Sequence, residues 1–219
     1  MIFDFDGVIL DSETPEYEAH RRIYEACGVS LTADEWCSQI GIWSENYEDR
    51  WFARLSEQAA SHPFDRAGFQ AEKSRLFQAI VPGEPMRGIR ELVEALATAA
   101  VPLAVASSSP ARWVVPALER LGLRGHFHAI VTGDEVANRK PSPDSYHEAA
   151  RRVGAEPFRA IAIEHSGPGV AAARAAGMKA IVIPHWLTES HDLSGADLRV
   201  SHAGELTLSL LESLCARTR

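Results

Sequence analysis

The chain has 219 residues, of which 46% are hydrophobic and 24% charged, as in a globular protein with one sizeable core or a core plus a small second unit. A net charge of −8 and the lack of any Lys/Arg-rich run argue against binding to nucleic acid or anionic membranes. With no signal peptide before the first strand and no apolar run of ~18 residues, we expect a cytoplasmic protein, monomeric or weakly dimeric. Three cysteines without metal-ligand spacing, expected as reduced and mostly buried thiols, are Cys27, Cys37 and Cys215.

The first predicted element is a short buried strand that ends in two carboxylates. Residues 2–8 read Ile-Phe-Asp-Phe-Asp-Gly-Val, so Asp4 and Asp6 project from the same face of the strand. Gly7 allows a sharp turn after them. Such a pair can divide the roles of nucleophile and general acid/base, or hold a hard cation. Taken alone, the tetrapeptide Asp-Phe-Asp-Gly at residues 4–7 is more often a turn or a weak calcium-type fragment, so its assignment depends on the rest of the chain.

Residues 13–81 show helical patterns without a convincing strand. Thr32 is predicted to cap one of these helices, with Glu35 at the capping-box position. Because the segment follows the first strand, it is expected to hang over the sheet edge that carries Asp4 and Asp6, as a candidate lid. The predicted helices cover residues 17–27, 32–40, 45–60 and 69–80.

From residue 82 onward, short apolar strands alternate with amphipathic helices. This alternation predicts an α/β fold with a doubly wound parallel sheet covered on both faces. We therefore predict a core of residues 1–12 plus 82–219 and a helical unit of residues 13–81. The predicted strands cover residues 101–106, 129–132, 160–163, 180–183 and 198–201, and the helices cover residues 88–100, 111–121, 144–153, 169–176 and 205–215.

Three further strand ends or turns carry polar residues. Ser107 and Ser108 follow one strand, where a hydroxyl and exposed backbone N–H groups can hold phosphate oxygens, although such a serine run also serves as a helix cap. Lys140 stands in a proline-rich turn before a helix, although a lone lysine is by default a solvated surface residue. Glu164 and His165 follow a fourth strand.

Taken in order, these motifs (Asp-x-Asp-Gly-Val, strand-Ser, Lys-Pro and strand-Glu-x-Ser) closely resemble the haloacid dehalogenase superfamily. Residues 13–81 resemble the four-helix cap of its β-phosphoglucomutase-like phosphatase group. The resemblance covers essentially the whole chain. It implies a Rossmann-like core with an inserted α-helical cap, and a metal-dependent phosphomonoester hydrolase acting on a small phosphorylated metabolite.

The resemblance also implies a role for each motif residue. Asp4 attacks phosphorus and forms an aspartyl-phosphate, while Asp6 protonates the leaving oxygen and later activates water. Ser107 and the Ser108 amide bind the transferring phosphoryl group, and Lys140 neutralises it and orients Asp4. A halide leaves without a proton, so dehalogenases lack the second aspartate. Its presence here favours phosphoester chemistry.

The pattern departs from the phosphatase group at one position. The dipeptide at 164–165 is normally Glu-Asp, whose second carboxylate binds Mg²⁺, but here it is Glu164-His165. Mg²⁺ prefers oxygen ligands, leaving Asp4, the Asp6 carbonyl and Glu164 as its predicted protein ligands. Three outcomes are open: Mg²⁺ binding rescued by Glu164, which we prefer, with His165 as a bystander; a shift to Mn²⁺, Co²⁺ or Zn²⁺; or a site that binds phosphate but turns over slowly.

Other activities of the superfamily are less consistent with the residues. β-Phosphoglucomutase has a histidine where this chain has Glu16, and His20, expected on the helix surface, is a poor substitute. A phosphonatase needs a cap lysine, and Lys73 is the only one. Trp43 is a candidate substrate contact or a packing residue. Two alternatives to the phosphatase therefore remain, a phosphosugar mutase and a catalytically impaired phosphometabolite-binding protein.

Overall fold

The computed structural model describes residues 1–41 and 47–216. Trp43 lies outside this part of the chain. The strands form a parallel six-stranded sheet in the order β3-β2-β1-β4-β5-β6. Because β1 pairs with β2 on one side and β4 on the other, the strand order reverses at β1, where open α/β sheets bind ligands. The strands are β1 (Ile2–Phe3), β2 (Ala104–Ala106), β3 (Ala129–Val131), β4 (Ile161–Glu164), β5 (Lys179–Val182) and β6 (Leu198–Arg199).

Helices cover both faces of the sheet, which confirms the predicted doubly wound α/β fold. Large side chains of the strands pack against α5 (Ile89–Thr98), α6 (Ala111–Arg120) and α9 (Leu208–Ala216). Smaller ones face α7 (Asp144–Arg152) and α8 (Gly167–Ala175). The large set includes Phe3, Val105, Ile163 and Ile181. The small set includes Ala104, Ala106, Ala162 and Ala180.

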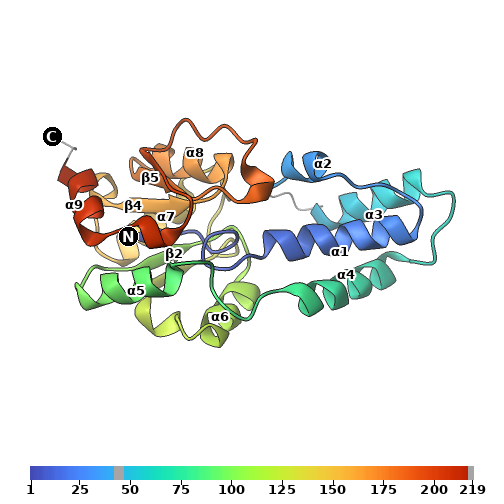
Figure 1. Ribbon diagram of the computed structural model, residues 1–219, viewed down its shortest axis with the longest axis horizontal. Helices are drawn as coiled ribbons and strands as arrows, with labels where there is room; N and C mark the ends of the chain where they lie inside the picture. The colour runs from blue at the N-terminus through green and yellow to red at the C-terminus, as the bar shows by residue number, and fades with distance from the viewer. Residues whose placement is uncertain (42–46, 217–219) are drawn as a thin grey trace.

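The segment between β1 and β2 forms a helical unit with its own core. Its helices are α1 (Glu13–Ala26), α2 (Ala33–Cys37), α3 (Tyr47–Gln58) and α4 (Arg66–Ile80). Figure 1 shows α1, α3 and α4 extending side by side away from the sheet. The boundaries at residues 12 and 82 stay a prediction. The core of this unit, which also receives Leu187 from the C-terminal half, includes Tyr24, Trp36, Trp51, Leu55 and Phe69.

The surface position predicted for His20 is wrong. Its side chain is fully buried, and its ring lies 4.8 Å from the Trp36 ring and 5.7 Å from those of Trp51 and Phe69. Its Nδ1 lies 2.8 Å from the Glu16 carbonyl oxygen. The face of α1 that carries His20 is covered by the other helices of the unit, so a polar residue there lies in the aromatic core.

Several element boundaries differ from their predicted positions for identifiable reasons. Helix α1 begins at Glu13, because Pro15 is tolerated in a first helical turn. Strand β2 begins only at Ala104, because Pro102 cannot donate to a sheet ladder. The predicted cap of α2 is confirmed. The Thr32 side chain accepts a hydrogen bond from the backbone N–H of Glu35, and the Glu35 side chain accepts one from the backbone N–H of Thr32.

The cysteines and the helices bear on two other expectations. Among the described residues the cysteines form no disulfide; Cys37 is buried, Cys27 is half-buried and Cys215 is exposed. The expectation of mostly buried thiols is therefore wrong for one of them. Within residues 1–41 and 47–216, we find no helix whose length and hydrophobicity would suit a transmembrane segment.

Candidate active site

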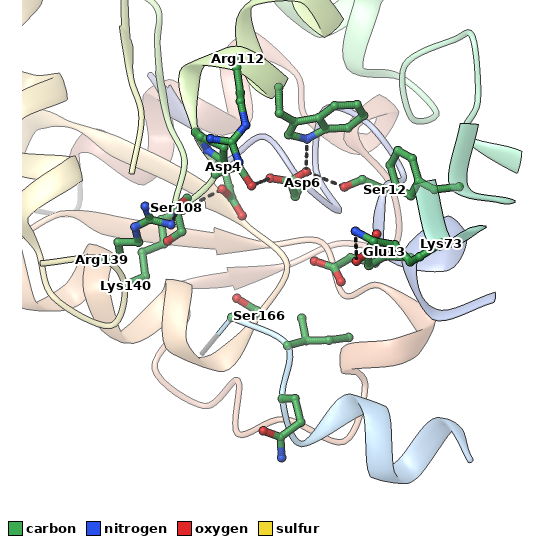
Figure 2. A pocket seen from close by; sticks show the side chains of 18 of the residues that line it. Asp4, Asp6, Ser12, Glu13, Lys73, Ser108, Arg112, Arg139, Lys140 and Ser166 are labelled. Atoms are coloured by element: carbon green, nitrogen blue, oxygen red, sulfur yellow. Dashed lines mark hydrogen bonds and ion pairs between the residues drawn. The ribbon is translucent and has the colours of Figure 1, made fainter. Parts of the chain in front are cut away.

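A cavity of about 800 Å³ lies over the carboxyl ends of the strands, between the sheet and the helical unit. Figure 2 shows Asp4 and Asp6 in this cavity, with Lys140 and Arg139 on one side and Lys73 of α4 on the other. The predicted residues that line it are Asp4, Asp6, Glu16, Ser108, Lys140 and His165. Ser107 and Glu164 contact these residues from behind the cavity wall.

Asp4 follows β1 directly and is held in place from two sides. Its backbone N–H donates to the carbonyl oxygen of Ile163 over 2.9 Å. Its Oδ1 lies 2.8 Å from Lys140 Nζ, and its Oδ2 lies 3.2 Å from His165 Nδ1. Burial alone would raise the pKa of Asp4, but the charges and hydrogen bonds of Lys140 and His165 lower it to about 2. Asp4 is therefore ionised at neutral pH, as a nucleophile must be.

Asp6 lies in a different environment. Its Oδ1 accepts hydrogen bonds from Ser12 Oγ (2.6 Å) and Trp113 Nε1 (2.9 Å). Its Oδ2 accepts one from Ser109 Oγ (2.6 Å) and a longer one from Ser107 Oγ (3.4 Å). Burial raises the pKa of Asp6, although these hydroxyl and indole donors oppose the shift. Two carboxyl groups with opposite pKa shifts in one cavity can serve as nucleophile and acid.

Lys140 forms a buried ion-pair network behind Asp4. Its Nζ lies 2.6 Å from Glu164 Oε1, and Tyr146 donates its hydroxyl to the same oxygen over 2.6 Å. Burial would lower the pKa of Lys140, but Asp4 and Glu164 raise it, so the ammonium stays charged. Lys140 is only 5% exposed, so it is not the solvated surface residue that a lone lysine is by default.

These contacts give Glu164 a second role beside the predicted rescue of Mg²⁺ binding. Its Oε1 is already bound by Lys140 and Tyr146, and its Oε2 accepts the backbone N–H of His165 over 3.1 Å. The side chain is fully buried. Glu164 acts here first as the counter-ion that positions Lys140, and its place among metal ligands stays a prediction.

Gly169 at the start of α8 leaves room for the Glu164 carboxylate. A Cβ at this glycine would lie 2.0 Å from Glu164 Oε2, so Gly169→Ala forces the carboxylate out of its buried network. We expect a loss of about 1–3 kcal/mol in the free energy of unfolding, measured by urea denaturation. Gly125→Ala is the matched control, because a Cβ there meets nothing within 4 Å, and it should change stability by less than about 0.5 kcal/mol. Equal stabilities of the two variants would contradict this steric argument.

His165 contacts the nucleophile and is not the bystander that the sequence suggested. Besides its contact with Asp4, its Nε2 lies 3.5 Å from Glu13 Oε1 of α1. Burial would lower the pKa of His165, but hydrogen bonds and charges from Asp4 and Glu13 raise it to about 10. The ring also packs over Gly7, where a Cβ would lie 2.6 Å from the imidazole Cδ2. Gly7 thus provides both the left-handed turn, with φ of 67°, and the space for this ring.

Asp4, Glu164 and His165 form a group that could hold a metal ion, with one ligand atom from each within 4.8 Å of the others. His165 Nδ1 lies 3.2 Å from Asp4 Oδ2 and 3.8 Å from Glu164 Oε2. Neighbouring ligands of a tetrahedral site with bonds of about 2.0–2.1 Å lie about 3.3 Å apart. One imidazole and two carboxylates at these spacings fit a cation that accepts nitrogen, and fit Mg²⁺ less well.

Several residues that line the cavity or lie behind its wall were not identified from the sequence. Ser12 and Ser109 stand beside the motifs that were recognised, so their hydroxyls could have been included. Trp113 and Tyr146 carry no such signal, because an aromatic residue on a helix normally indicates packing. Arg139 precedes Lys140 and donates to the Ser108 carbonyl oxygen over 3.0 Å, thereby joining the lysine turn to the serine turn.

The helical unit contributes a charged pair to the opposite wall. Glu16 of α1 lies with its Oε1 3.2 Å from Lys73 Nζ of α4, and both line the cavity. Glu16 stands where the resemblance places the mutase histidine, so the ion pair occupies that region. Its role in specificity stays a prediction.

Comparisons with known proteins identify the family of this chain. A family model described as haloacid dehalogenase-like hydrolase matches residues 1–183. The phosphorylated carbohydrates phosphatase of Thermotoga maritima is 33% identical over 181 residues, covering 83% of this chain and 82% of the relative. Hexitol phosphatase B of Escherichia coli is 28% identical over 209 residues, covering 94% of this chain and 93% of the relative.

A solved structure extends the similarity to three dimensions. CbbY from Rhodobacter sphaeroides in complex with phosphate matches with a TM-score of 0.74 and 28% identity, covering 96% of this chain and 97% of that chain. The fold, the family match and the named relatives thus lead to the same conclusion. The chain belongs to the haloacid dehalogenase-like hydrolase family and is a phosphatase that acts on phosphoric monoesters.

Proposed function

We propose that Asp4 attacks the phosphorus of the substrate and forms an aspartyl-phosphate, which water then hydrolyses. Asp6 donates a proton to the leaving oxygen and takes one from water in the second step. The observation that carries this proposal is the contrast between the two carboxyl groups in one cavity. The pKa of Asp4 is lowered by Lys140 and His165, and that of Asp6 is raised by burial.

The surrounding donors suit the charge of the transition state. The transferring phosphoryl group spreads negative charge over its oxygens, so fixed cations and hydrogen-bond donors around it supply most of the rate gain. We assign this role to Lys140, Ser107 and Ser108. The Ser108 hydroxyl supports the assignment, because it is buried at the cavity and has no hydrogen-bond partner among the described residues.

For the substrate, we propose a small phosphorylated metabolite of the sugar or sugar-alcohol class. The two relatives described above are named as phosphatases of phosphorylated carbohydrates and of hexitols. The cavity of about 800 Å³ has room for a molecule of this size. Glu16 and Lys73 on its far wall offer one acceptor group and one donor group to sugar hydroxyls.

For the cofactor, we propose a divalent cation held by Asp4, Glu164 and His165, whose binding would displace the proton that Asp4 and Glu13 otherwise keep on the imidazole. When bound, such an ion supplies charge stabilisation to a phosphoryl oxygen. Because one of the three ligands is an imidazole, we propose Mn²⁺, Co²⁺ or Zn²⁺ in preference to Mg²⁺. The protein's own donors, Lys140 foremost, then act beside the ion.

The testing experiment measures products from a panel of hexose, pentose and hexitol phosphates, each with Mg²⁺, Mn²⁺, Co²⁺ and Zn²⁺ in turn. Release of inorganic phosphate that depends on Asp4 supports the proposal. An isomerised phosphosugar in place of free phosphate would identify a mutase. Ligand-induced stabilisation without any turnover would identify a phosphometabolite-binding protein.

A further inference from the structure

Trp113 makes a hydrogen bond that the roles above do not use. It lies in the first turn of α6, and its indole N–H donates to Asp6 Oδ1 over 2.9 Å. An indole nitrogen can only donate a hydrogen bond. The same Oδ1 also accepts from Ser12 Oγ over 2.6 Å. A proton on Oδ1 could reach Ser12 Oγ, but it would make Oδ1 a weaker acceptor for the Trp113 N–H, which can only donate.

The other oxygen of Asp6 has different partners. Oδ2 faces Ser109 Oγ at 2.6 Å and Ser107 Oγ at 3.4 Å. A serine hydroxyl can donate or accept, because its hydrogen rotates. A proton on Oδ2 therefore finds an acceptor, and Ser109 turns its own hydrogen elsewhere. Oδ2 is also the oxygen beside Ser107, the proposed phosphoryl-binding residue.

We propose that Trp113 is a positioning residue that keeps the proton of Asp6 on Oδ2, and that this oxygen, which lies beside Ser109 and Ser107, protonates the leaving group. This proposal rests on the proposed acid role of Asp6. Without the indole N–H, protonation at Oδ1 and Oδ2 becomes comparable, and the carboxyl group gains freedom to turn its proton toward Ser12. Part of the molecules then present the wrong oxygen to the substrate.

The indole is held firmly enough for this task. Its ring meets Phe5 at a centroid distance of 6.1 Å and Phe77 of α4 at 5.3 Å, both edge to face. One contact comes from the segment that carries Asp6, and the other from the helical unit. The N–H direction is therefore set by packing on both sides of the ring, which makes it a fixed donor.

The test compares a poor with a good leaving group. Trp113→Phe keeps an aromatic ring and removes the N–H. For a hexose phosphate, whose alkoxide must be protonated as it leaves, we expect kcat/KM to fall by about 10–100-fold, a part of the full value of a general acid. For p-nitrophenyl phosphate, whose leaving group needs no proton, we expect a fall of less than about threefold by the same reasoning.

Trp186→Phe is the matched control. It also removes an indole N–H, which donates to Thr14 Oγ1 over 2.9 Å, and it should leave the ratio of the two kcat/KM values unchanged. Phe77→Leu, which keeps the Trp113 N–H but loosens its ring, should give an intermediate ratio and serves if Trp113→Phe does not fold. The proposal is overturned if Trp113→Phe leaves the ratio of the two kcat/KM values unchanged, whether both values fall equally or neither falls.

The variant Asp6→Asn distinguishes a failure of the role proposed for Trp113 from a failure of the acid role proposed for Asp6. If Asp6 is the acid, this variant should discriminate most strongly between the two substrates. If Asp6→Asn treats both substrates alike, the acid role itself fails. If Asp6→Asn discriminates and Trp113→Phe does not, only the role of Trp113 fails.

Discussion

Asp4→Asn is expected to reduce phosphate release to background with every substrate and every metal. The amide cannot attack phosphorus or carry the phosphoryl group, so the reaction loses its covalent route. Removal of a nucleophile from a concerted catalytic unit typically costs roughly 10⁴-fold or more. The measurement is the steady-state release of inorganic phosphate, with the aryl phosphate as the most sensitive substrate.

The fold should survive this change. Asparagine has nearly the same shape as aspartate, and Lys140 keeps Glu164 as a counter-ion at 2.6 Å, so no unpaired ammonium is left buried. Asp11→Asn is the matched control, since Asp11 lies near the same segment but outside the cavity lining and pairs with His185 at 3.2 Å. Turnover by Asp4→Asn close to that of Asp11→Asn would disprove the nucleophilic mechanism.

His165→Asp is expected to give the second large effect, a gain of Mg²⁺ affinity of roughly 10–100-fold, the range over which metal-site partners act. The substitution replaces an imidazole by an oxygen ligand, which Mg²⁺ prefers. It also leaves a third carboxylate beside Asp4 and Glu164, with Lys140 as the nearby ammonium. The metal-free variant should therefore melt at a lower temperature than the native chain, and Mg²⁺ should restore its melting temperature by binding the folded state.

Thermal melting with increasing Mg²⁺ and Mn²⁺ measures this effect without relying on activity. His165→Asn is the control, because it shortens the side chain to the same length and removes the same imidazole without adding a negative charge. It should be destabilised less than His165→Asp, and Mg²⁺ should not raise its melting temperature. The prediction is wrong if the native chain already binds Mg²⁺ as tightly as His165→Asp does. It is also wrong if Mg²⁺ leaves the melting of His165→Asp unchanged.

The parts of the site that were predictable follow from backbone geometry. Parallel strands bring their carboxyl ends to one edge, so a polar residue at the end of a strand can be placed without knowing any side-chain conformation. Asp4, Asp6 and Ser108 were found together in this way, whereas Lys140, in a turn before α7, was assigned to the site only by the family resemblance. The fold class could be predicted for the same reason, since alternating apolar strands and amphipathic helices admit few arrangements.

The parts that could not be predicted depend on which side chains meet across elements. His165 was taken for a bystander because its partner Glu13 belongs to a helix far away in sequence, and only packing brings the two together. His20 was assigned to a surface because a single helix does not reveal how many neighbours cover it. Trp113 was missed because an indole that packs and an indole that donates look the same in a sequence.

The alanine-rich face of the sheet has a consequence for the chemistry above it. Methyl groups on the strands let α7 lie close to the sheet, and α7 carries Tyr146, whose hydroxyl must reach Glu164 at the end of β4 over 2.6 Å. The distance between α7 and the sheet thus determines whether the Tyr146 hydroxyl can bond to Glu164. Because Glu164 also binds Lys140, the same distance affects the position of the Lys140 ammonium. Residues such as Ala162, remote from any substrate, act as the spacers against which the charged centre is aligned.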